Sequence, residues 1–367
     1  MTPEDKERQS KRLKREISRI REKISDYENA VSLVSSLQQW FEYRWGIGGR
    51  VVPGRLLSFE RFTLWENGLR PDFVARFKTP YVLCGECKKT FPSGNGRRKD
   101  ALQVAAYSRR KLQAKPGEPT PNYDVLLLVD TDSDDAAASA LNDLKKDAPN
   151  LAPVAPIVIL GYRLTEERIR HWFSVKWRRH DGMNSRFSEP NVVDQPDQED
   201  LNKLIVEPTR HSIPLDLHAL DLTDRVPFIN DDPPPLYTLR RVLIPALNEL
   251  LTDDQRDTLA TSGRIDMSLT YDVITKVPLL RGRRFPERYI RDALGYLVKV
   301  GWARCDEKAK PPRYIFRCDL RMIQGNLTEL LTKKEARMVL SPLRRRRRQR
   351  AGTQQLEIPF DTDTPYR

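Results

Sequence analysis

The chain has 367 residues, 39% of them hydrophobic and 31% charged, and carries a formal net charge of +13. This composition can fill the cores of two ordinary domains, and no apolar run approaches the roughly 20 residues that cross a bilayer. The distant cysteine pairs Cys84/Cys87 and Cys305/Cys318 do not suggest a disulfide framework, and the N-terminus lacks the apolar centre of a secretion signal. We therefore expect a globular protein of the cytoplasm or the nucleoid, without membrane contact.

The excess positive charge lies mainly on two arms. Residues 1–25 hold nine Lys/Arg and five Asp/Glu, and residues 337–350 hold seven Arg and no acid. Such arms suit loose attachment to a polyanion such as DNA better than the reading of a base sequence. Solvated charge that keeps the protein soluble is the alternative, and it suits the N-terminal arm better than the arginine run at 344–348.

Apolar residues at alternating three- and four-residue steps predict a helix over residues 4–44. The stripe contains Leu13, Ile17, Ile20, Ile24, Tyr27, Val31 and Val34. It favours a coiled-coil dimer or, as the commoner case, an amphipathic helix packed on its own domain. Residues 1–25 would form a basic helical extension, and the glycines within 46–49 separate the helix from an extended stretch at 50–64.

Residues 70–88 predict a β-hairpin that turns at 78–80. Asp72 and Glu86 are equally distant from the centre of this turn, so they lie opposite each other across the two strands. Side chains alternate along a strand, and Lys88 therefore shares a face with Glu86. An aspartate, a glutamate and a lysine then converge, as a divalent ion held against a phosphodiester requires. An ordinary cross-strand salt bridge is the alternative explanation.

The rest of the first domain alternates helices and apolar strands. The pattern predicts helices over 97–113, 134–147 and 164–178, and strands over 123–131 and 155–164. Continuous apolar runs are typical of central strands that are covered on both faces. The order of elements predicts an α/β domain over residues 26–179.

A polar, proline-rich linker is expected over 180–235, followed by a second domain over 236–325. Its pattern predicts helices over 236–251, 252–261, 271–280 and 286–300, and then two strands around a Lys/Pro-rich tip. Helices followed by such a hairpin predict a winged helix-turn-helix domain. A last helix and the arginine run occupy 326–350, and residues 351–367 are expected to be a disordered tail.

Pro71-Asp72 followed by Glu86-Cys87-Lys88 resembles the signature of the PD-(D/E)xK nuclease superfamily. The order of elements also resembles that superfamily's restriction endonuclease-like αβββαβ core. The resemblance implies that Asp72 and Glu86 hold a catalytic Mg²⁺, with Mn²⁺ as a substitute. It also implies that Lys88 positions or helps to activate the water that attacks a phosphodiester bond.

The same resemblance implies further site residues on two helices. Glu28 occupies the place of the acid that such nucleases often add from their first helix. Gln103 and Tyr107 match a pair that many members carry after the third strand, and they are one helical turn apart. We expect Glu28 and Gln103 to act in catalysis and Tyr107 to face the site or the DNA. Arg97 and Arg98, near the start of that helix, are expected to bind the DNA backbone.

The helix predicted over 286–300 is the candidate recognition helix. Arg288 and Arg291 lie on its early turns, where they can meet base edges, whereas Arg283 and Arg284 precede it and suit phosphates. A winged-helix module used for protein contact is the alternative interpretation.

One segment of the tail resembles the peptide by which bacterial proteins bind the replication sliding clamp. It consists of a Gln-Leu pair followed by spaced apolar residues, here Gln355, Leu356, Ile358 and Phe360. A polar, flexible tail is where such a peptide is expected. The bacterial sliding clamp is therefore a predicted partner.

These features together predict a Mg²⁺-dependent DNA endonuclease that a winged helix positions on DNA, in phage defence, repair or mobile-element processing. A non-catalytic DNA-binding or assembly protein with a degenerate nuclease fold is the alternative. The sequence leaves open a homodimer, a partner ATPase, and the choice among duplex, branched and single-stranded substrates.

Overall fold

The computed structural model describes residues 3–45, 51–53, 56–62, 69–77, 81–88, 95–109, 122–166, 171–179, 212–214, 227–276, 286–319 and 327–340. The chain divides into two compact units. The first, here called the sheet unit, consists of Ser25–Glu249 and Asp272–Ala293. The second, here called the small unit, consists of Met1–Ile24, Leu250–Tyr271 and Leu294–Arg367.

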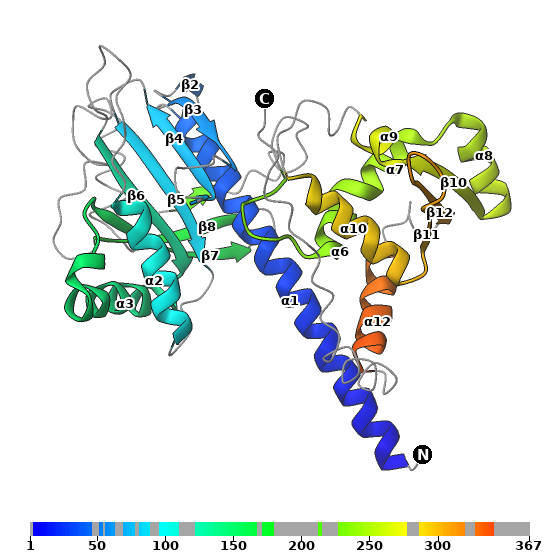
Figure 1. Cartoon of the computed structure of the whole chain (residues 1–367), viewed down its shortest axis with the longest axis horizontal. Coiled ribbons are helices and arrows are strands. Elements are labelled where there is room, and N and C mark those ends of the chain that lie inside the picture. The colour runs from blue at the N-terminus through cyan, green and yellow to red at the C-terminus, as the bar shows by residue number, and fades with distance from the viewer. Residues whose placement is uncertain are drawn as a thin grey trace. The chain divides into compact units, whose positions relative to one another are not determined.

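The sheet unit is a mixed α/β structure built on seven strands in the order β3-β4-β5-β6-β7-β8-β9 (Figure 1). The central strands β5, β6 and β7 run parallel, and every other neighbouring pair is antiparallel. The strands are β3 (Leu56–Glu60), β4 (Phe73–Phe77), β5 (Tyr81–Lys88), β6 (Asn122–Asp130), β7 (Ile157–Glu166), β8 (His171–Arg179) and β9 (Ser212–Pro214). Two short strands, β1 (Tyr43–Trp45) and β2 (Val51–Pro53), pair separately.

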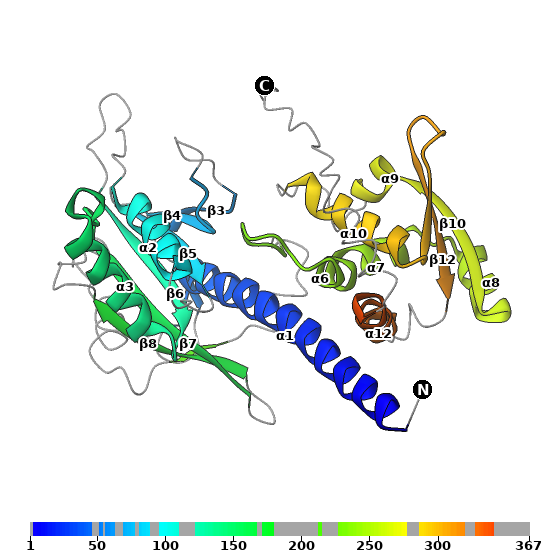
Figure 2. The same cartoon turned by 60° about the horizontal axis from the view of Figure 1, so that its bottom comes forward.

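Helices α2 (Asn95–Ser108) and α3 (Asp134–Asp147) cover one face of the sheet, and a 3₁₀ turn, η2 (Pro149–Leu151), follows α3 (Figure 2). Val104 and Leu141 of these helices pack in one core with Val74, Leu127 and Ile159 of the strands. The residues that alternate with them point to the opposite face and are buried too, as at Leu83, Leu126, Leu128 and Leu160. The central strands are therefore covered on both faces, as their continuous apolar sequence predicts.

Local sequence explains where two of the helices begin and end. Helix α3 carries acids in its first turn and lysines in its last, which complements the helix dipole at both ends. Helix α8 (Asp253–Ser262) begins with a capping box between Thr252 and Gln255. It ends at Gly263, whose φ of +70° lies in the left-handed region that glycine adopts without strain.

Helix α1 (Pro3–Glu42) confirms the long helix predicted at the start of the chain. Within the sheet unit its apolar stripe is buried, since Tyr27, Val31 and Val34 have almost no exposed surface. Burial and, to a smaller extent, the nearby charge of Asp26 on α1 raise the pKa of Tyr162 of β7. The Tyr162 side chain points away from the sheet face that α2 and α3 cover. This part of the stripe therefore packs on its own chain, which is the second of the two interpretations above.

The helix predicted over 164–178 is wrong, because this stretch forms the end of β7 and most of β8. The two strands pair antiparallel from Val158 opposite Arg179 to Glu166 opposite His171. Aromatic and β-branched residues favour a strand, and the free edge of β7 hydrogen-bonds with alternate residues of an antiparallel partner. Strand β9, inside the predicted linker, extends the same sheet by pairing with β8. Over so short an apolar run, periodicity does not separate helix from strand.

The remaining elements begin at residue 235. The segments α6 (Pro235–Thr238), the π-helical η4 (Leu239–Leu243) and α7 (Ile244–Leu250) form the first predicted helix. They are followed by α8, α9 (Tyr271–Thr275), α10 (Glu287–Lys299) and α12 (Leu327–Leu340). In the small unit, β10 (Arg264–Thr270), β11 (Ala303–Asp306) and β12 (Arg313–Asp319) form an antiparallel sheet in the order β10-β12-β11. The pattern did not predict β10.

The two units do not divide at the predicted domain boundary near residue 235. Residues 235–249 and 272–293 group with the sheet unit, and residues 1–24 group with the small unit. Aromatic packing explains the difference, because the ring of Tyr237 lies 4.7 Å from that of Tyr27 and 6.4 Å from that of Phe228, and all three are buried. None of the described helices combines the length and apolar character needed to cross a bilayer.

Candidate active site

The predicted hairpin register is confirmed. Strand β4 pairs Phe73 with Gly85 of β5, and the Asp72 N–H donates to the Gly85 carbonyl at 2.9 Å. Asp72 therefore stands opposite Glu86, immediately beyond the last paired residue of β4. The predicted turn at 78–80 lies outside the described residues.

Gly85 is required at the register position next to the two acids. A Cβ there would overlap the ring of Phe73, which is fully buried and stacks on Phe59 with the ring centroids 4.8 Å apart. We expect Gly85→Ala to lower the free energy of unfolding by about 2–3 kcal/mol, because the packed ring has no room to move. Thermal unfolding measures the loss. Gly295→Ala is the matched control, since nothing lies within 4 Å of a Cβ on that exposed helical glycine, and an equal loss in both variants would contradict the prediction.

The Asp72 carboxylate is buried and is held by two backbone donors. The Cys87 N–H donates to Oδ2 at 2.7 Å, and the Asn230 N–H donates to Oδ1 at 2.8 Å. Burial and then the nearby charge of Asp231 raise the pKa of Asp72 to about 6, against the opposing effects of these N–H groups and of Lys88. Metal-free Asp72 is thus a desolvated acid in a fixed orientation.

The Glu86 carboxylate is also buried, and only one of its oxygens is satisfied. Oε1 accepts from Gln103 Nε2 and pairs with Lys88 Nζ, both at 2.8 Å, whereas Oε2 is buried and has no hydrogen-bond partner among the residues that the structure describes. Burial and then the charge of Asp72 raise the pKa of Glu86 to about 8. A buried oxygen without a partner is costly in a native fold, and a site built to receive a cation explains it.

Lys88 remains an ammonium in this setting. Burial disfavours its charged form, but the carboxylates of Glu86, Asp231 and Asp72 outweigh burial and raise the pKa of Lys88 above its ordinary value. Lys88 therefore offers positive charge and N–H donors near the carboxylate pair, and it does not act as a base in this conformation.

Gln103 and Tyr107 of α2 do face the carboxylate pair, but they have different roles. Gln103 Nε2 reaches both Glu86 Oε1 and, at 3.0 Å, the Tyr107 hydroxyl, which itself donates to the Arg70 carbonyl at 3.0 Å. The Tyr107 side chain has no exposed surface. Its predicted contact with DNA is corrected accordingly, because a phosphate has no access to it, and Tyr107 instead orients Gln103.

The structure does not bring Glu28 to this group. Both oxygens of its carboxylate are engaged by guanidinium groups, one by Arg240 and the other by Arg241, whose Nε donates at 2.8 Å. Its predicted catalytic role is corrected, because the charge of Glu28 is neutralised within the sheet unit between α1 and η4. The two arginines follow Glu28 by more than 200 positions, so no local pattern reveals the contact.

The structure describes only some of the arginines that are expected to bind DNA. Arg98 is exposed on α2, and Arg97 is on the same helix, with its side chain outside the described residues. Arg283, Arg284 and the predicted clamp-binding residues also lie outside the described residues.

Arg288 and Arg291 stand exposed on the first turns of α10, as the recognition-helix hypothesis requires. Each also has an acidic neighbour: Arg288 pairs with Asp232 at 2.7 Å, and Arg291 pairs with Glu287 at 3.3 Å. Exposed pairs of this kind are weak and can be exchanged for phosphate.

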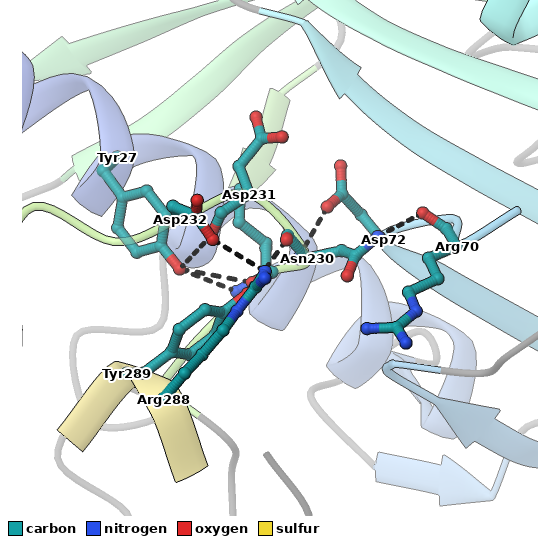
Figure 3. Close-up of polar contacts among 9 residues, drawn as sticks. Tyr27, Arg70, Asp72, Asn230, Asp231, Asp232, Arg288 and Tyr289 are labelled. Atoms are coloured by element: carbon teal, nitrogen blue, oxygen red, sulfur yellow. Dashed lines mark hydrogen bonds and ion pairs between the residues drawn. The ribbon is translucent and has the colours of Figure 1, made fainter. Parts of the chain in front are cut away.

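Two residues near the site were missed by the sequence analysis. Asn230 and Asp231 belong to a stretch interpreted as linker, yet the Asn230 backbone N–H donates to Asp72. The charge of Asp231 contributes to the raised pKa values of Asp72, Glu86 and Lys88. Figure 3 shows the Asp231 and Asp72 carboxylates pointing the same way. The acids at 231–232 before three prolines were visible, but nothing local connects them to a strand 158 positions earlier.

No protein-family model matches the chain, and no match was found among curated proteins or among solved structures. The functional assignment therefore rests on the chemistry of the site itself.

The carboxylates of Asp72 and Glu86 fit a hard divalent cation. Mg²⁺ in proteins is commonly held by one or two carboxylates, with water and substrate phosphate filling its other positions. The buried Glu86 Oε2, which has no partner among the described residues, is the ligand atom that such an ion would bind. Among the residues that the structure describes, no three His, Cys, Asp or Glu side chains are grouped to hold a metal, so an ion here would depend on water and substrate for further ligands.

Proposed function

We propose that the chain is a Mg²⁺-dependent DNA endonuclease with a restriction endonuclease-like core. The observation that carries the proposal is the buried pair Asp72 and Glu86, desolvated, with one oxygen lacking a partner, beside a lysine that stays charged. Perturbed pKa values that cluster around one spot are typical of catalytic sites.

Each residue has a role that follows from its contacts. Asp72 and Glu86 would hold Mg²⁺, which when bound polarises the phosphate and stabilises the charge of the transition state. The Lys88 ammonium can orient the attacking water and offset charge that develops on phosphate oxygens. Gln103 holds Glu86 in place through Oε1, which would leave Oε2 to bind the ion.

A plain cross-strand salt bridge explains less of this arrangement. The ion pair between Lys88 and Glu86 Oε1, at 2.8 Å, joins two residues of the same strand β5. Among the described residues it leaves Glu86 Oε2 without a partner and Asp72 buried beside the negative charge of Asp231. A non-catalytic protein with a degenerate fold would have no use for two desolvated acids, whose burial lowers stability at neutral pH.

Contact with DNA is supported by the elements after residue 250. The order α8, α10 and then the antiparallel hairpin β11–β12 supports a winged helix-turn-helix. The hairpin carries exposed cations on both strands and on its tip, namely Arg304, Lys308, Lys310, Arg313 and Arg317. They suit phosphate contacts, and binding to DNA through them should weaken steeply with salt.

Cleavage of supercoiled plasmid by the full chain tests the proposal. With Mg²⁺ or Mn²⁺ we expect nicked or linear products, and EDTA should abolish them because the two carboxylates alone cannot activate water. Linear, flapped, branched and single-stranded substrates then define the preferred target. Cleavage that persists in EDTA, or no cleavage of any substrate with either ion, would contradict the proposed function.

A further inference from the structure

A short stretch of chain, residues 227–232, here called the strap, lies against Asp72. Phe228 and Ile229 are buried, and the strap forms no helix or strand. Side chains from distant elements bind its backbone: the Tyr237 hydroxyl donates to Pro227 O at 2.7 Å, Arg61 Nη1 to Phe228 O at 3.0 Å, and Tyr27 to Ile229 O and Asp231 O, both at 3.3 Å. A backbone held at so many points has little freedom to move.

One side of the strap binds the catalytic aspartate. The Asn230 N–H donates to Asp72 Oδ1 at 2.8 Å, and the Asn230 side-chain amide donates to the Arg70 carbonyl. Both contacts lie just before β4, where Asp72 stands outside the last paired residue of the strand. The Asp72 carboxylate is therefore held from two sides, Oδ2 by the Cys87 N–H of β5 and Oδ1 by the Asn230 N–H of the strap.

The other side of the strap binds two tyrosine hydroxyls. Tyr289 of α10 reaches Asn230 O at 2.9 Å and Ile229 O at 3.3 Å, and the Tyr27 hydroxyl also accepts from the Ile229 N–H at 3.2 Å. Figure 3 shows Asn230 between these tyrosines and Asp72. Tyr289 is buried, and its ring packs 5.2 Å from that of Phe228.

The two sides are joined by a single rigid group. The Ile229 carbonyl and the Asn230 N–H belong to one planar peptide unit, in which the oxygen and the hydrogen point in opposite directions. The Tyr27 and Tyr289 hydroxyls, which both reach this oxygen at 3.3 Å, thus help to fix the plane whose N–H points at Asp72. Tyr289 also holds the next peptide unit, through Asn230 O at 2.9 Å. Both hydroxyls also polarise the first of these peptides, which strengthens its bond to the carboxylate.

We propose that Tyr289 is a positioning residue for Asp72 and acts through the strap. The inference rests on the proposed function, because it concerns the orientation of a metal-binding carboxylate. A donor behind a metal ligand sets the ligand's geometry, and losing it commonly weakens metal affinity by about 10–100-fold. The first turn of the candidate recognition helix would thereby help to build the catalytic centre.

Tyr289→Phe in the full chain tests this assignment, because it removes the hydroxyl and keeps the ring. We expect about 10-fold weaker Mn²⁺ binding by electron paramagnetic resonance and a similar rise in the Mg²⁺ needed for half-maximal plasmid cleavage. Saturating Mg²⁺ should restore the wild-type rate. The control is Tyr296→Phe, because Tyr296 lies on the same helix and binds Leu331 O, at 3.5 Å, instead of the strap.

A second variant, Tyr27→Phe, removes the other hydroxyl from the same peptide and should shift the Mn²⁺ affinity in the same direction. Unchanged Mn²⁺ affinity in both variants, an equal shift in Tyr296→Phe, or a slower rate with unchanged Mn²⁺ affinity would overturn the assignment. If the wild-type chain neither binds Mn²⁺ nor cleaves DNA, the proposed function fails. If the wild type does both and Tyr289→Phe matches it, only the positioning role fails.

Discussion

Glu86→Gln is expected to abolish Mg²⁺-dependent cleavage while making the metal-free protein more stable at pH 8. The glutamine oxygen can keep the bonds that Oε1 makes to Gln103 and Lys88, so the fold is retained. The neutral amide cannot hold a divalent cation, and the rate of plasmid cleavage should fall by about 10³-fold, or about 4 kcal/mol of transition-state stabilisation.

The gain in stability follows from the raised pKa of Glu86, from an ordinary 4.5 to about 8. Below pH 4.5 the carboxyl is protonated in both the folded and the unfolded chain, so the substitution changes nothing. As the pH rises from 4.5 to 8 the unfolded chain loses the proton first, and the wild type loses stability that the glutamine variant keeps. We expect a difference of about 4 kcal/mol at pH 8 in EDTA, measured by thermal unfolding.

Glu60→Gln is the matched control for this substitution. Glu60 lies on β3 of the same sheet, but it is exposed and pairs with Arg76 at 3.7 Å. Its neutralisation should leave both cleavage and stability close to wild type. Two results would contradict the role assigned to Glu86. One is cleavage by Glu86→Gln at the wild-type rate, and the other is the same pH dependence of stability in Glu86→Gln as in the wild type.

Lys88→Met is expected to slow cleavage by about 10²–10³-fold without weakening Mn²⁺ binding. The methionine keeps most of the apolar stem and removes the ammonium that offsets charge in the transition state, a loss of the size seen when a single such donor is removed. Removing a cation 2.8 Å from Glu86 should leave Mn²⁺ binding unchanged or tighter. Cleavage rates at saturating Mg²⁺ and Mn²⁺ titrations measure the two effects separately.

The control for Lys88 is Lys99→Met, which removes an exposed lysine from α2. It should leave the rate at saturating Mg²⁺ unchanged. If Lys88→Met cleaves at the wild-type rate, the lysine serves only as a counter-charge for Glu86. If it loses Mn²⁺ binding together with cleavage, its role is to maintain the metal site.

Much of the site could be predicted because its geometry is local. The register that sets Asp72 against Glu86 follows from hairpin symmetry, and the alternation of β5 places Lys88 beside Glu86. Gln103 meets Glu86, and Tyr107 supports Gln103, because residues one helical turn apart share a face. Each of these relations spans few residues and depends on one element or one strand pair.

Other features could not be predicted, because they depend on which distant surfaces meet. Glu28 had the right chemistry and chain position for a catalytic acid, yet Arg240 and Arg241 neutralise it. The stretch over 164–178 had the composition of either a helix or a strand, and the free edge of β7 decided for a strand. Burial likewise turned Tyr107 from a DNA contact into an internal support.

The sequence by itself determined the acids, the lysine and their spacing, since strand and helix periodicity act over a few residues. Only the tertiary structure decided what orients them, because the strap at 227–232 reaches Asp72 through a hydrogen bond that spans 158 positions. The strap carries no periodic pattern, and its backbone is held by side chains from α1, α6 and α10. Such a segment has the composition of a linker and becomes part of a site only when the folded chain satisfies its peptide groups.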